Sequence, residues 1–354
     1  MNSYAYYRLP YSDSYTVLES ERNPLVLTSY ESIGSDCGFI IAPFSITDET
    51  PLLLIQPDSI ASHKVPQQES AEVAPVDECR VGTANDASPS YCQAFAAFHD
   101  AVSDGRLHKL VLARLSTITV DSADVEALFL RACQLYPRLM IMLFHTPQSG
   151  TWLISSPEIL IETCQGERQL HTIALAGTMP YAEGYPAWSE KNKAEQHIVE
   201  QYIEDSIRPM CRHIIKDGPV TMRAGNLAHL RTDFRFTLDT GISLGCVISR
   251  LHPTPAVCGM PKHEAQQFIA EHEQLDRRYY SGFAGPVGIN GETHLYVSLR
   301  CASLTADTAI LYAGGGIMPE SQCDAEWQET ENKMLTIRKV LTARNKRFIR
   351  KSGW

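Results

Sequence analysis

The pattern of apolar and polar residues predicts many strands and fewer helices. Apolar residues that recur every three or four positions indicate helices, and shorter apolar stretches between turn residues indicate strands. Short strands are expected within residues 1–60, and the polar, proline-containing residues 63–90 are expected to form a loop. The expected helices cover 88–105, 124–135, 189–215, 261–274 and 323–346. The longer strands are expected at 107–120, 139–146, 151–163, 170–178, 229–237, 282–288, 293–303 and 308–314.

The order of these elements favours an α+β fold. The expected strands follow one another in pairs, without the regular strand–helix alternation of a doubly wound parallel sheet. Paired consecutive strands are typical of antiparallel sheets, because a short turn joins antiparallel neighbours. We therefore expect large antiparallel sheets with helices packed outside them.

Composition excludes several classes of partner. The chain has 354 residues and a net charge of -10, which argues against binding nucleic acid or an anionic membrane surface. The first residues lack the basic and apolar regions of a signal peptide, and no apolar stretch is long enough to span a membrane. None of the ten cysteines forms a CxxC motif. Reduced thiols and a cytoplasmic location are expected.

The first candidate for chemistry is Lys109, at the head of the apolar stretch HKLVLAR, residues 108–114. Lysine is rarely buried without a partner. Burial disfavours the charged form of an amine, and in this way a lysine becomes a general base near neutral pH. The alternative is a strand-end lysine whose long side chain reaches water.

A second candidate is Glu158, which opens the apolar run of the stretch SSPEIL, residues 155–160. Apolar surroundings raise the pKa of a carboxyl group, which then serves as a general acid. Pro157 is consistent with a strand start or a bulge that re-aims this side chain. An exposed glutamate at a sheet edge is the alternative.

Two predicted helices carry candidate metal ligands. Glu195 lies in one of them, and Glu326 and Glu329 lie three positions apart in the other. Carboxylate oxygens together with water and an anionic substrate are the usual ligands of magnesium. Lys333 follows Glu329 by four positions and adds a positive charge on the same helix face. Charged helices that simply face solvent are the alternative.

Two further stretches suit an anionic ligand. Gly314, Gly315 and Gly316 follow an apolar strand, and glycine allows successive backbone N–H groups to converge on an anion. A glycine-rich hairpin turn is the alternative, and no GKS or GKT follows as in a nucleotide P-loop. Arg300 is expected inside the strand 293–303, where it suits a carboxylate contact or a cross-strand ion pair.

Taken in order, these residues resemble the chorismate-utilising enzymes, and most closely the isochorismate synthases. The matching stretches are HKLVLAR, SSPEILIE, IALAGTMP, KNKAEQHIVE, LHPTPAVCGMP, YYSGFAGPVG, VSLRCA, YAGGGIMPES and EWQETENK. The resemblance implies one large domain of two facing antiparallel sheets, the fold of anthranilate synthase component I. Residues 91–346 are expected to form the chorismate-binding region, and residues 1–90 match the family poorly.

The resemblance also implies a reaction and its residues. Chorismate would be converted to isochorismate with magnesium, with Lys109 as the base that activates water and Glu158 as the acid that protonates the leaving hydroxyl. Glu195 and Glu329 correspond to the magnesium ligands, and Glu326 would act through metal-bound water. The residues implied in substrate binding are Ala176, Gly177, Thr178, His252, Leu299, Arg300, Gly314, Gly315, Gly316 and Lys333.

Two positions favour water as the nucleophile. Anthranilate synthases, which use ammonia, carry glutamine where Lys109 stands, and aminodeoxychorismate synthases carry a lysine where Ala176 stands. We therefore expect no glutamine amidotransferase subunit. A monomer or weak homodimer is expected, and the resemblance implies a menaquinone or siderophore pathway. A salicylate synthase, which also eliminates pyruvate, and an inactive anion-binding relative are the alternatives. Gly315 replaces the alanine that the family usually has.

Overall fold

The computed structural model describes residues 2–66, 87–120, 124–163, 169–181 and 187–342. The helices are α1 Pro89–Ser103, α2 Val125–Leu135, α3 Glu190–Ile207, α4 Leu244–Leu251, α5 Lys262–His272 and α6 Cys323–Thr342. The first nine strands are β1 Ser3–Arg8, β2 Ser14–Ser20, β3 Leu25–Leu27, β4 Gly38–Ala42, β5 Leu52–Ile55, β6 Ser59–Lys64, β7 Lys109–Thr119, β8 Met140–Thr146 and β9 Gly150–Ser156. The others are β10 Ile159–Thr163, β11 Gln169–Pro180, β12 Cys211–Ala224, β13 Leu227–Leu238, β14 Gly259–Met260, β15 Phe283–Val287, β16 Thr293–Val297, β17 Cys301–Leu304 and β18 Thr308–Ile317.

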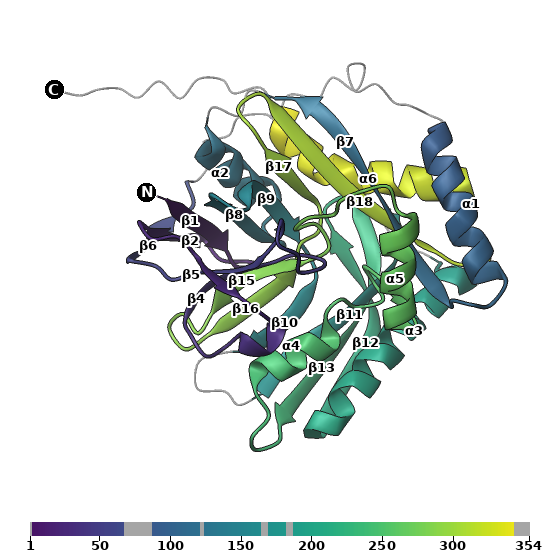
Figure 1. Cartoon of the computed structure of the whole chain (residues 1–354), viewed down its shortest axis with the longest axis horizontal. Helices are drawn as coiled ribbons and strands as arrows, with labels where there is room; N and C mark the ends of the chain where they lie inside the picture. Colours follow the sequence, from purple (N-terminus) through teal and green to yellow (C-terminus); the bar gives the residue numbers. More distant parts are fainter. Residues whose placement is uncertain (1, 67–86, 121–123, 164–168, 182–186, 343–354) are drawn as a thin grey trace.

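The strands form two nine-stranded sheets. One has the order β14-β7-β18-β17-β9-β8-β1-β2-β6, and the other has the order β12-β13-β11-β10-β16-β15-β4-β5-β3. All the described strand neighbours run antiparallel, as in the pairs β7–β18 and β11–β13. Strands from the first 64 residues join both sheets, so the amino-terminal part is built into the same body as the rest (Figure 1). The predicted α+β class is confirmed.

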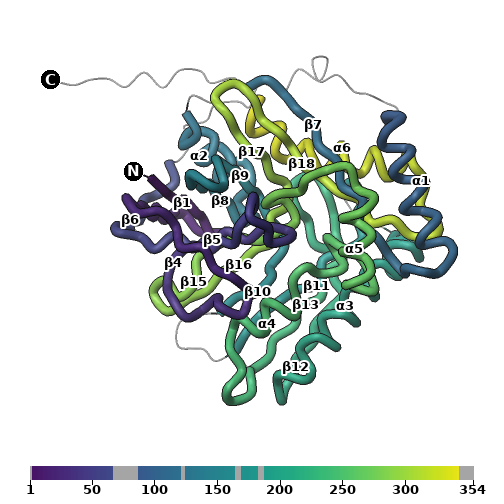
Figure 2. The backbone as a smooth tube through the Cα atoms, viewed as in Figure 1, coloured from purple at the N-terminus to yellow at the C-terminus, as the bar shows by residue number. Residues whose placement is uncertain are grey.

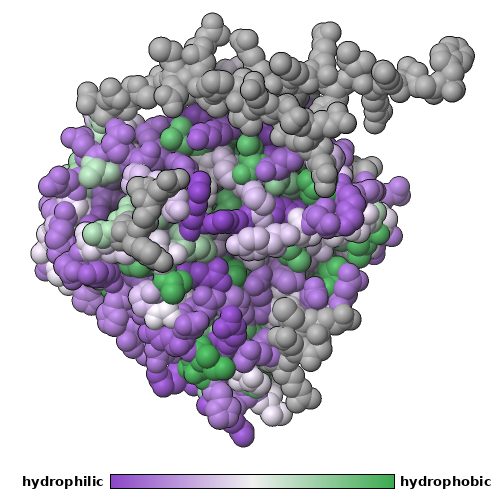
Figure 3. All heavy atoms as spheres, turned by 180° about the vertical axis from the view of Figure 1, so that it is seen from behind, coloured by the Kyte–Doolittle hydropathy of each residue, from purple (hydrophilic) through white to green (hydrophobic). Residues whose placement is uncertain are grey.

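Apolar side chains pack both between the sheets and under the helices. Phe39, Trp152 and Tyr279, all fully buried, belong to a core that takes residues from both sheets. Separate cores lie where α3 and α4 cover one sheet and where α2 and α6 cover the other. Figure 2 shows the helices on the outside of this arrangement. The face in Figure 3 is mostly hydrophilic, with hydrophobic residues in small separate groups.

Local signals set several helix starts. Ser88, Asp124, Ser189 and Ser243 each precede a helix, and each side-chain oxygen accepts a hydrogen bond from the backbone N–H three residues later. Such caps satisfy N–H groups that have no partner inside the helix. None of the described helices combines the length and the apolar character needed to cross a membrane.

The structure corrects some predicted boundaries. The helix predicted at 189–215 ends at Ile207, before Pro209, and residues 211–224 form the edge strand β12. The strand predicted at 151–163 is interrupted at Pro157, which has no N–H to donate to a ladder. The helix α4 was not predicted. Most of the predicted loop 63–90, and residues 343–346 of the last predicted helix, lie outside the described residues.

The strand predicted at 293–303 is also interrupted, and Arg300 is therefore not inside a strand. It lies between β16 and β17 with a φ of 48°, in the left-handed region that few residues other than glycine adopt. A side chain at such a point leaves the regular alternation of the strand, so the strand pattern does not predict its direction.

Candidate active site

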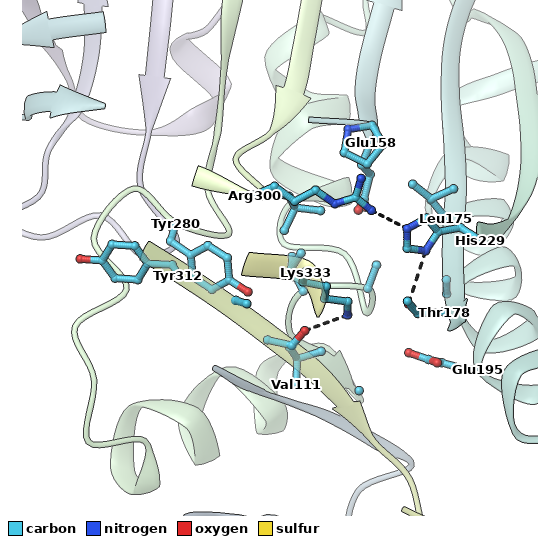
Figure 4. Close-up of a pocket in the computed structure, with 18 residues that line it drawn as sticks. Val111, Glu158, Leu175, Thr178, Glu195, His229, Tyr280, Arg300, Tyr312 and Lys333 are labelled. Atoms are coloured by element: carbon cyan, nitrogen blue, oxygen red, sulfur yellow. Dashed lines mark hydrogen bonds between the residues drawn. The ribbon is translucent and has the colours of Figure 1, made fainter. Parts of the chain in front are cut away.

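A cavity lies where strands of the two sheets approach α3 and α6 (Figure 4). The predicted site residues that line it are Glu158, Ala176, Thr178, Glu195, Leu299, Arg300, Gly314, Gly316 and Lys333. They come from stretches far apart in the sequence, and the two sheets bring them together. Lys109, Gly177 and Glu329 contact the lining residues Glu195, His229 and Lys333, respectively. Gly315 lies between two lining glycines, and Glu326 contacts Lys191 and Ser321, which do not line the cavity.

Lys109 is the first residue of β7, and its side chain is fully buried. Its Nζ forms an ion pair with Oε1 of Glu195, on α3, at 2.8 Å. Burial by itself would raise the pKa of Glu195, but the adjacent Lys109 ammonium outweighs it, and the pKa is lowered. The buried lysine is therefore held against a carboxylate at the cavity wall and does not reach out to solvent.

Glu158 lies between β9 and β10, directly after Pro157, and its side chain is 2% exposed. Burial raises the pKa of its carboxyl group to about 7, although the charges of Lys109, Lys333 and Arg300 oppose the shift. The Thr254 hydroxyl is the nearest donor to this carboxyl, at 3.4 Å from Oε1. Glu158 is thus a carboxyl group that holds a proton near neutral pH, as a general acid requires.

Arg300 faces the cavity together with a histidine that the sequence analysis missed. Its guanidinium donates to Nε2 of His229 and to the Ala224 carbonyl, and His229 Nδ1 lies 3.1 Å from the Gly177 carbonyl. Burial, with the positive charges of Arg300 and Lys333, holds the pKa of His229 well below its usual range. The ring is therefore neutral, with Nδ1–H donating to Gly177. The only sequence signal was a histidine at the head of a predicted strand.

His252 lies outside this cavity, in contrast to the pocket position that the resemblance implied. Its ring packs against Tyr30 and Phe283, with centroid distances of 5.1 and 4.9 Å, and burial lowers its pKa to about 3. A cis peptide joins it to Pro253, and Thr254 is the residue of this loop that reaches Glu158. Contact with Glu158 therefore comes from Thr254, two residues after the predicted His252.

Three carboxylates beside the cavity are each paired with a lysine. Glu195 pairs with Lys109, Glu329 with Lys333 at 2.7 Å, and Glu326 with Lys191. Burial by itself would lower the pKa of Lys191, but the charges of all three acids outweigh it and raise this pKa. Within the described residues, no group of three or more potential ligands is placed to hold a metal ion. Each of the three predicted metal ligands is thus paired with a lysine, and their role as magnesium ligands stays a prediction.

The glycines of β18 allow these side chains to approach the strand. A Cβ atom on Gly316 would lie 2.3 Å from Glu195 Oε1, and one on Gly314 would lie 2.8 Å from the Tyr280 hydroxyl. The Gly314 carbonyl accepts a hydrogen bond from Lys333 at 2.8 Å. That the N–H groups of Gly314 to Gly316 bind an anion stays a prediction.

Fold and site together define a class of enzyme. The cavity joins a carboxyl group with a raised pKa, fixed cations and the apolar side chains of Leu175 and Leu299, and the buried Lys109–Glu195 ion pair lies at its wall. These are the groups needed for acid–base chemistry on a small, mostly apolar anion.

The comparisons with known proteins give the family. The family model described as chorismate binding enzyme matches residues 44–342, and the chain belongs to this family. A Mycobacterium tuberculosis protein that carries the provisional name isochorismate synthase MenF is 32% identical in an alignment of 321 positions that covers 83% of each chain. The isochorismate synthase EntC of Escherichia coli is 33% identical over 251 residues, covering 66% of this chain and 62% of that protein.

A solved structure shows the same fold. The menaquinone-specific isochorismate synthase MenF from Escherichia coli matches with a TM-score of 0.73 and 22% identity, covering 96% of this chain and 88% of that one. At this identity the likeness concerns the fold alone. It agrees with two facing antiparallel sheets and outer helices.

Proposed function

We propose that this protein is an isochorismate synthase that uses magnesium to convert chorismate into isochorismate. Water adds at ring carbon 2, and the hydroxyl group at carbon 4 leaves from the opposite side. The observation that carries this proposal is the presence of two buried ionisable side chains, those of Glu158 and Lys109, at one cavity. Glu158 holds a proton up to about pH 7, and the amine of Lys109 lies against Glu195 at the cavity wall.

Each group has a part in this proposal. The neutral amine form of Lys109 accepts a proton from water, and Glu158 gives a proton to the departing hydroxyl group. Such an acid and base commonly contribute factors of about 10² to 10⁴ each. Arg300 and Lys333 line the same cavity and would hold the carboxylates of the substrate, while His229 and Gly177 fix the direction of the Arg300 guanidinium.

Three acids at the site have the donor chemistry of magnesium ligands, and in this structure each of them is paired with a lysine. Glu195, Glu326 and Glu329 offer the hard oxygen ligands that magnesium prefers. Their charges already favour the Lys191 ammonium, and Oε2 of Glu326 is buried without a hydrogen-bond partner among the residues that the structure describes. Bound magnesium would supply positive charge toward the ring carboxylate of the substrate. Its binding would release the lysines that now neutralise these acids.

The products separate this function from its alternatives. Purified protein with chorismate and magnesium should form isochorismate, and removal of magnesium with a chelator should stop the reaction. Release of pyruvate with fluorescent salicylate would instead identify a salicylate synthase. Absence of turnover at any magnesium concentration, with the protein folded by circular dichroism, would identify an inactive anion-binding relative and overturn the proposal.

Replacing Lys109 tests the choice of water as nucleophile. Lys109→Gln should lower isochorismate formation by about 10² or more, because the base is lost while a hydrogen-bonding side chain of similar length remains. Ammonia added to this variant should restore attack at carbon 2, since it needs no activation. Unchanged isochorismate formation in the variant would contradict the role of Lys109 as base.

We further propose that the enzyme acts in the cytoplasm without an amidotransferase subunit. The eight described cysteines are all free thiols, which suits a reducing compartment. A lysine at position 109, with water as substrate, requires no supply of ammonia from a partner. A monomer or weak homodimer therefore suffices for catalysis, and size-exclusion chromatography of the active protein tests this.

A further inference from the structure

Two thiols meet where the first turns of α1 and α6 lie side by side, on one flank of the molecule (Figures 1 and 2). Cys92 belongs to α1, and Cys323 is the first residue of α6. The Cys323 thiol donates toward the sulfur of Cys92 at 3.2 Å, and the Cys92 side chain is exposed to solvent. The proposed activity assigns no role to either residue.

Contacts on both sides hold these two helix starts together. Tyr91 and Trp327, adjacent to the thiols, pack edge to face with ring centroids 5.1 Å apart, and both are buried. Farther along α1, the Nε2 atom of His99 lies 3.0 Å from the Pro319 carbonyl oxygen. The sulfur atoms are therefore kept near each other by packing around them, and their approach does not depend on one flexible side chain.

We propose that Cys92 and Cys323 form a reversible disulfide that links α1 to α6 when the protein meets a small-molecule disulfide such as oxidised glutathione. The Cys92 thiolate attacks one sulfur of the oxidant and displaces the first glutathione thiolate. Cys323, losing its proton, then attacks the Cys92 sulfur and displaces the second. Two protein thiols are oxidised by two electrons, and one glutathione disulfide is reduced to two thiols.

The surroundings of the pair assign these two roles. Burial, together with the hydrogen bond and charge of Cys92, raises the pKa of the Cys323 thiol to about 12. Cys323 therefore keeps its proton and donates it toward the Cys92 sulfur. The more exposed sulfur is the one that an oxidant in solution reaches first. Cys323 is then placed to resolve the mixed disulfide.

The bond would constrain a long stretch of chain. Cys92 and Cys323 are 231 positions apart, so the disulfide would restrict the unfolded state strongly. It would also fix the first turn of α6 against α1, one turn before Glu326. This inference goes beyond the proposed function and does not depend on it. Formation of the disulfide is measured by mass, and that measurement does not require catalytic activity.

The test is oxidation of the full-length protein with oxidised glutathione, followed by intact mass and a non-reducing peptide map. The expected result is loss of two hydrogen atoms and a peptide joining Cys92 to Cys323, both reversed by dithiothreitol. The thermal midpoint of the oxidised protein should rise by about 5 °C. Cys92→Ser and Cys323→Ser should each abolish both changes.

Cys246→Ser is the matched control, because Cys246 is also exposed and lies in the first turn of a helix. It should oxidise like the wild type. A persistent mixed disulfide with glutathione at Cys92, a disulfide between any other two cysteines, or no oxidation at all would overturn the proposal. The peptide map of the wild-type protein decides between these outcomes even where a serine variant folds poorly.

Discussion

Two glutamates of the same cavity differ in charge state because their neighbours differ. Glu195 has the ammonium of Lys109 at 2.8 Å, and its pKa is lowered. Glu158 accepts a hydrogen bond from the Thr254 hydroxyl at 3.4 Å and has no ion pair among the described residues, so burial dominates and raises its pKa to about 7. Environments that separate the pKa values of like groups give them distinct roles at one pH.

The pH dependence of kcat/KM tests the role of Glu158. A general acid must be protonated, and the protonated fraction of Glu158 is lost as the pH rises through about 7. The rate should therefore fall above that pH, and Glu158→Gln should lower kcat by about 10² to 10⁴ and remove this limb.

Thr254→Val is the companion variant for the same prediction. Its hydroxyl lowers the pKa of Glu158, so its removal should move the fall in rate to higher pH while leaving turnover near the wild-type level. A Glu158→Gln enzyme with normal turnover and only a raised KM would show that Glu158 binds the substrate without transferring a proton.

Interrupted strands place the main site residues. Glu158 follows the break between β9 and β10, and Arg300 occupies the break between β16 and β17 with its φ of 48°. Regular strands would turn successive side chains to opposite faces of a sheet. At these two breaks the chain re-aims a side chain toward the cavity, and a pattern of alternating residues does not reveal that.

Glycine in β18 makes room for the lysine–glutamate pair. In Gly316→Ala, the added Cβ would lie 2.3 Å from Glu195 Oε1 and 3.0 Å from Lys109 Cε, so this ion pair must shift. Overpacking of this kind commonly costs about 1–3 kcal/mol. We expect a lower free energy of unfolding, measured by urea denaturation, together with lost activity.

Gly315→Ala is the matched control on the opposite face of β18. Its Cβ would have a single close neighbour, Glu326 Oε2 at 2.9 Å, and the next atom lies at 3.8 Å. One flexible carboxylate can move, so the variant should keep most of its free energy of unfolding, which is the quantity compared between the two variants. Equal losses of stability in both variants would show that β18 is sensitive to any side chain and not to the position of Glu195.

Across the whole molecule, a second polar cluster lies on neighbouring strands of one sheet, away from the cavity. His171 lies between Glu162 and Asp233, and His294 also contacts Glu162. Burial by itself would lower the pKa of both histidines, but these carboxylates raise it. Hydrogen bonds from the histidines and Tyr296 outweigh burial at Glu162 and lower its pKa to about 2.

This cluster should make stability depend on pH. A histidine with a raised pKa contributes stability that is present below its ordinary value, about 6.5, and lost as the pH rises through the raised value. Glu162 contributes stability that is present above its ordinary pKa and lost as the pH falls toward about 2. The contribution of the cluster is therefore greatest near pH 5 to 6.

The thermal midpoint measures this dependence. The double variant His171→Asn, His294→Asn should melt a few degrees below the wild type near pH 6, and this difference should shrink by pH 9. His263→Asn, at an exposed position on α5, is the control and should match the wild type at both values. A difference that stays constant with pH would show that the histidines act by packing and not by charge.

The sequence by itself determined the elements and most of the chemistry-bearing residue types. Periodicity and turn residues predicted α1, α2, α5, α6 and the strands β7, β8 and β11, because these signals are local. Lys109 and Glu158 stood out because a charged residue in an apolar stretch is rarely buried unless a partner or a function stabilises it there. The ordered motifs gave the family.

Only the tertiary structure decided which charges meet. The lysine partners of Glu195, Glu326 and Glu329, the part of His229 and the place of His252 outside the cavity depend on contacts between residues far apart in the chain. Burial and pairing set charge state, and both arise when the two sheets and the outer helices close around the cavity. A local sequence pattern does not predict the distances between residues that lie far apart in the chain.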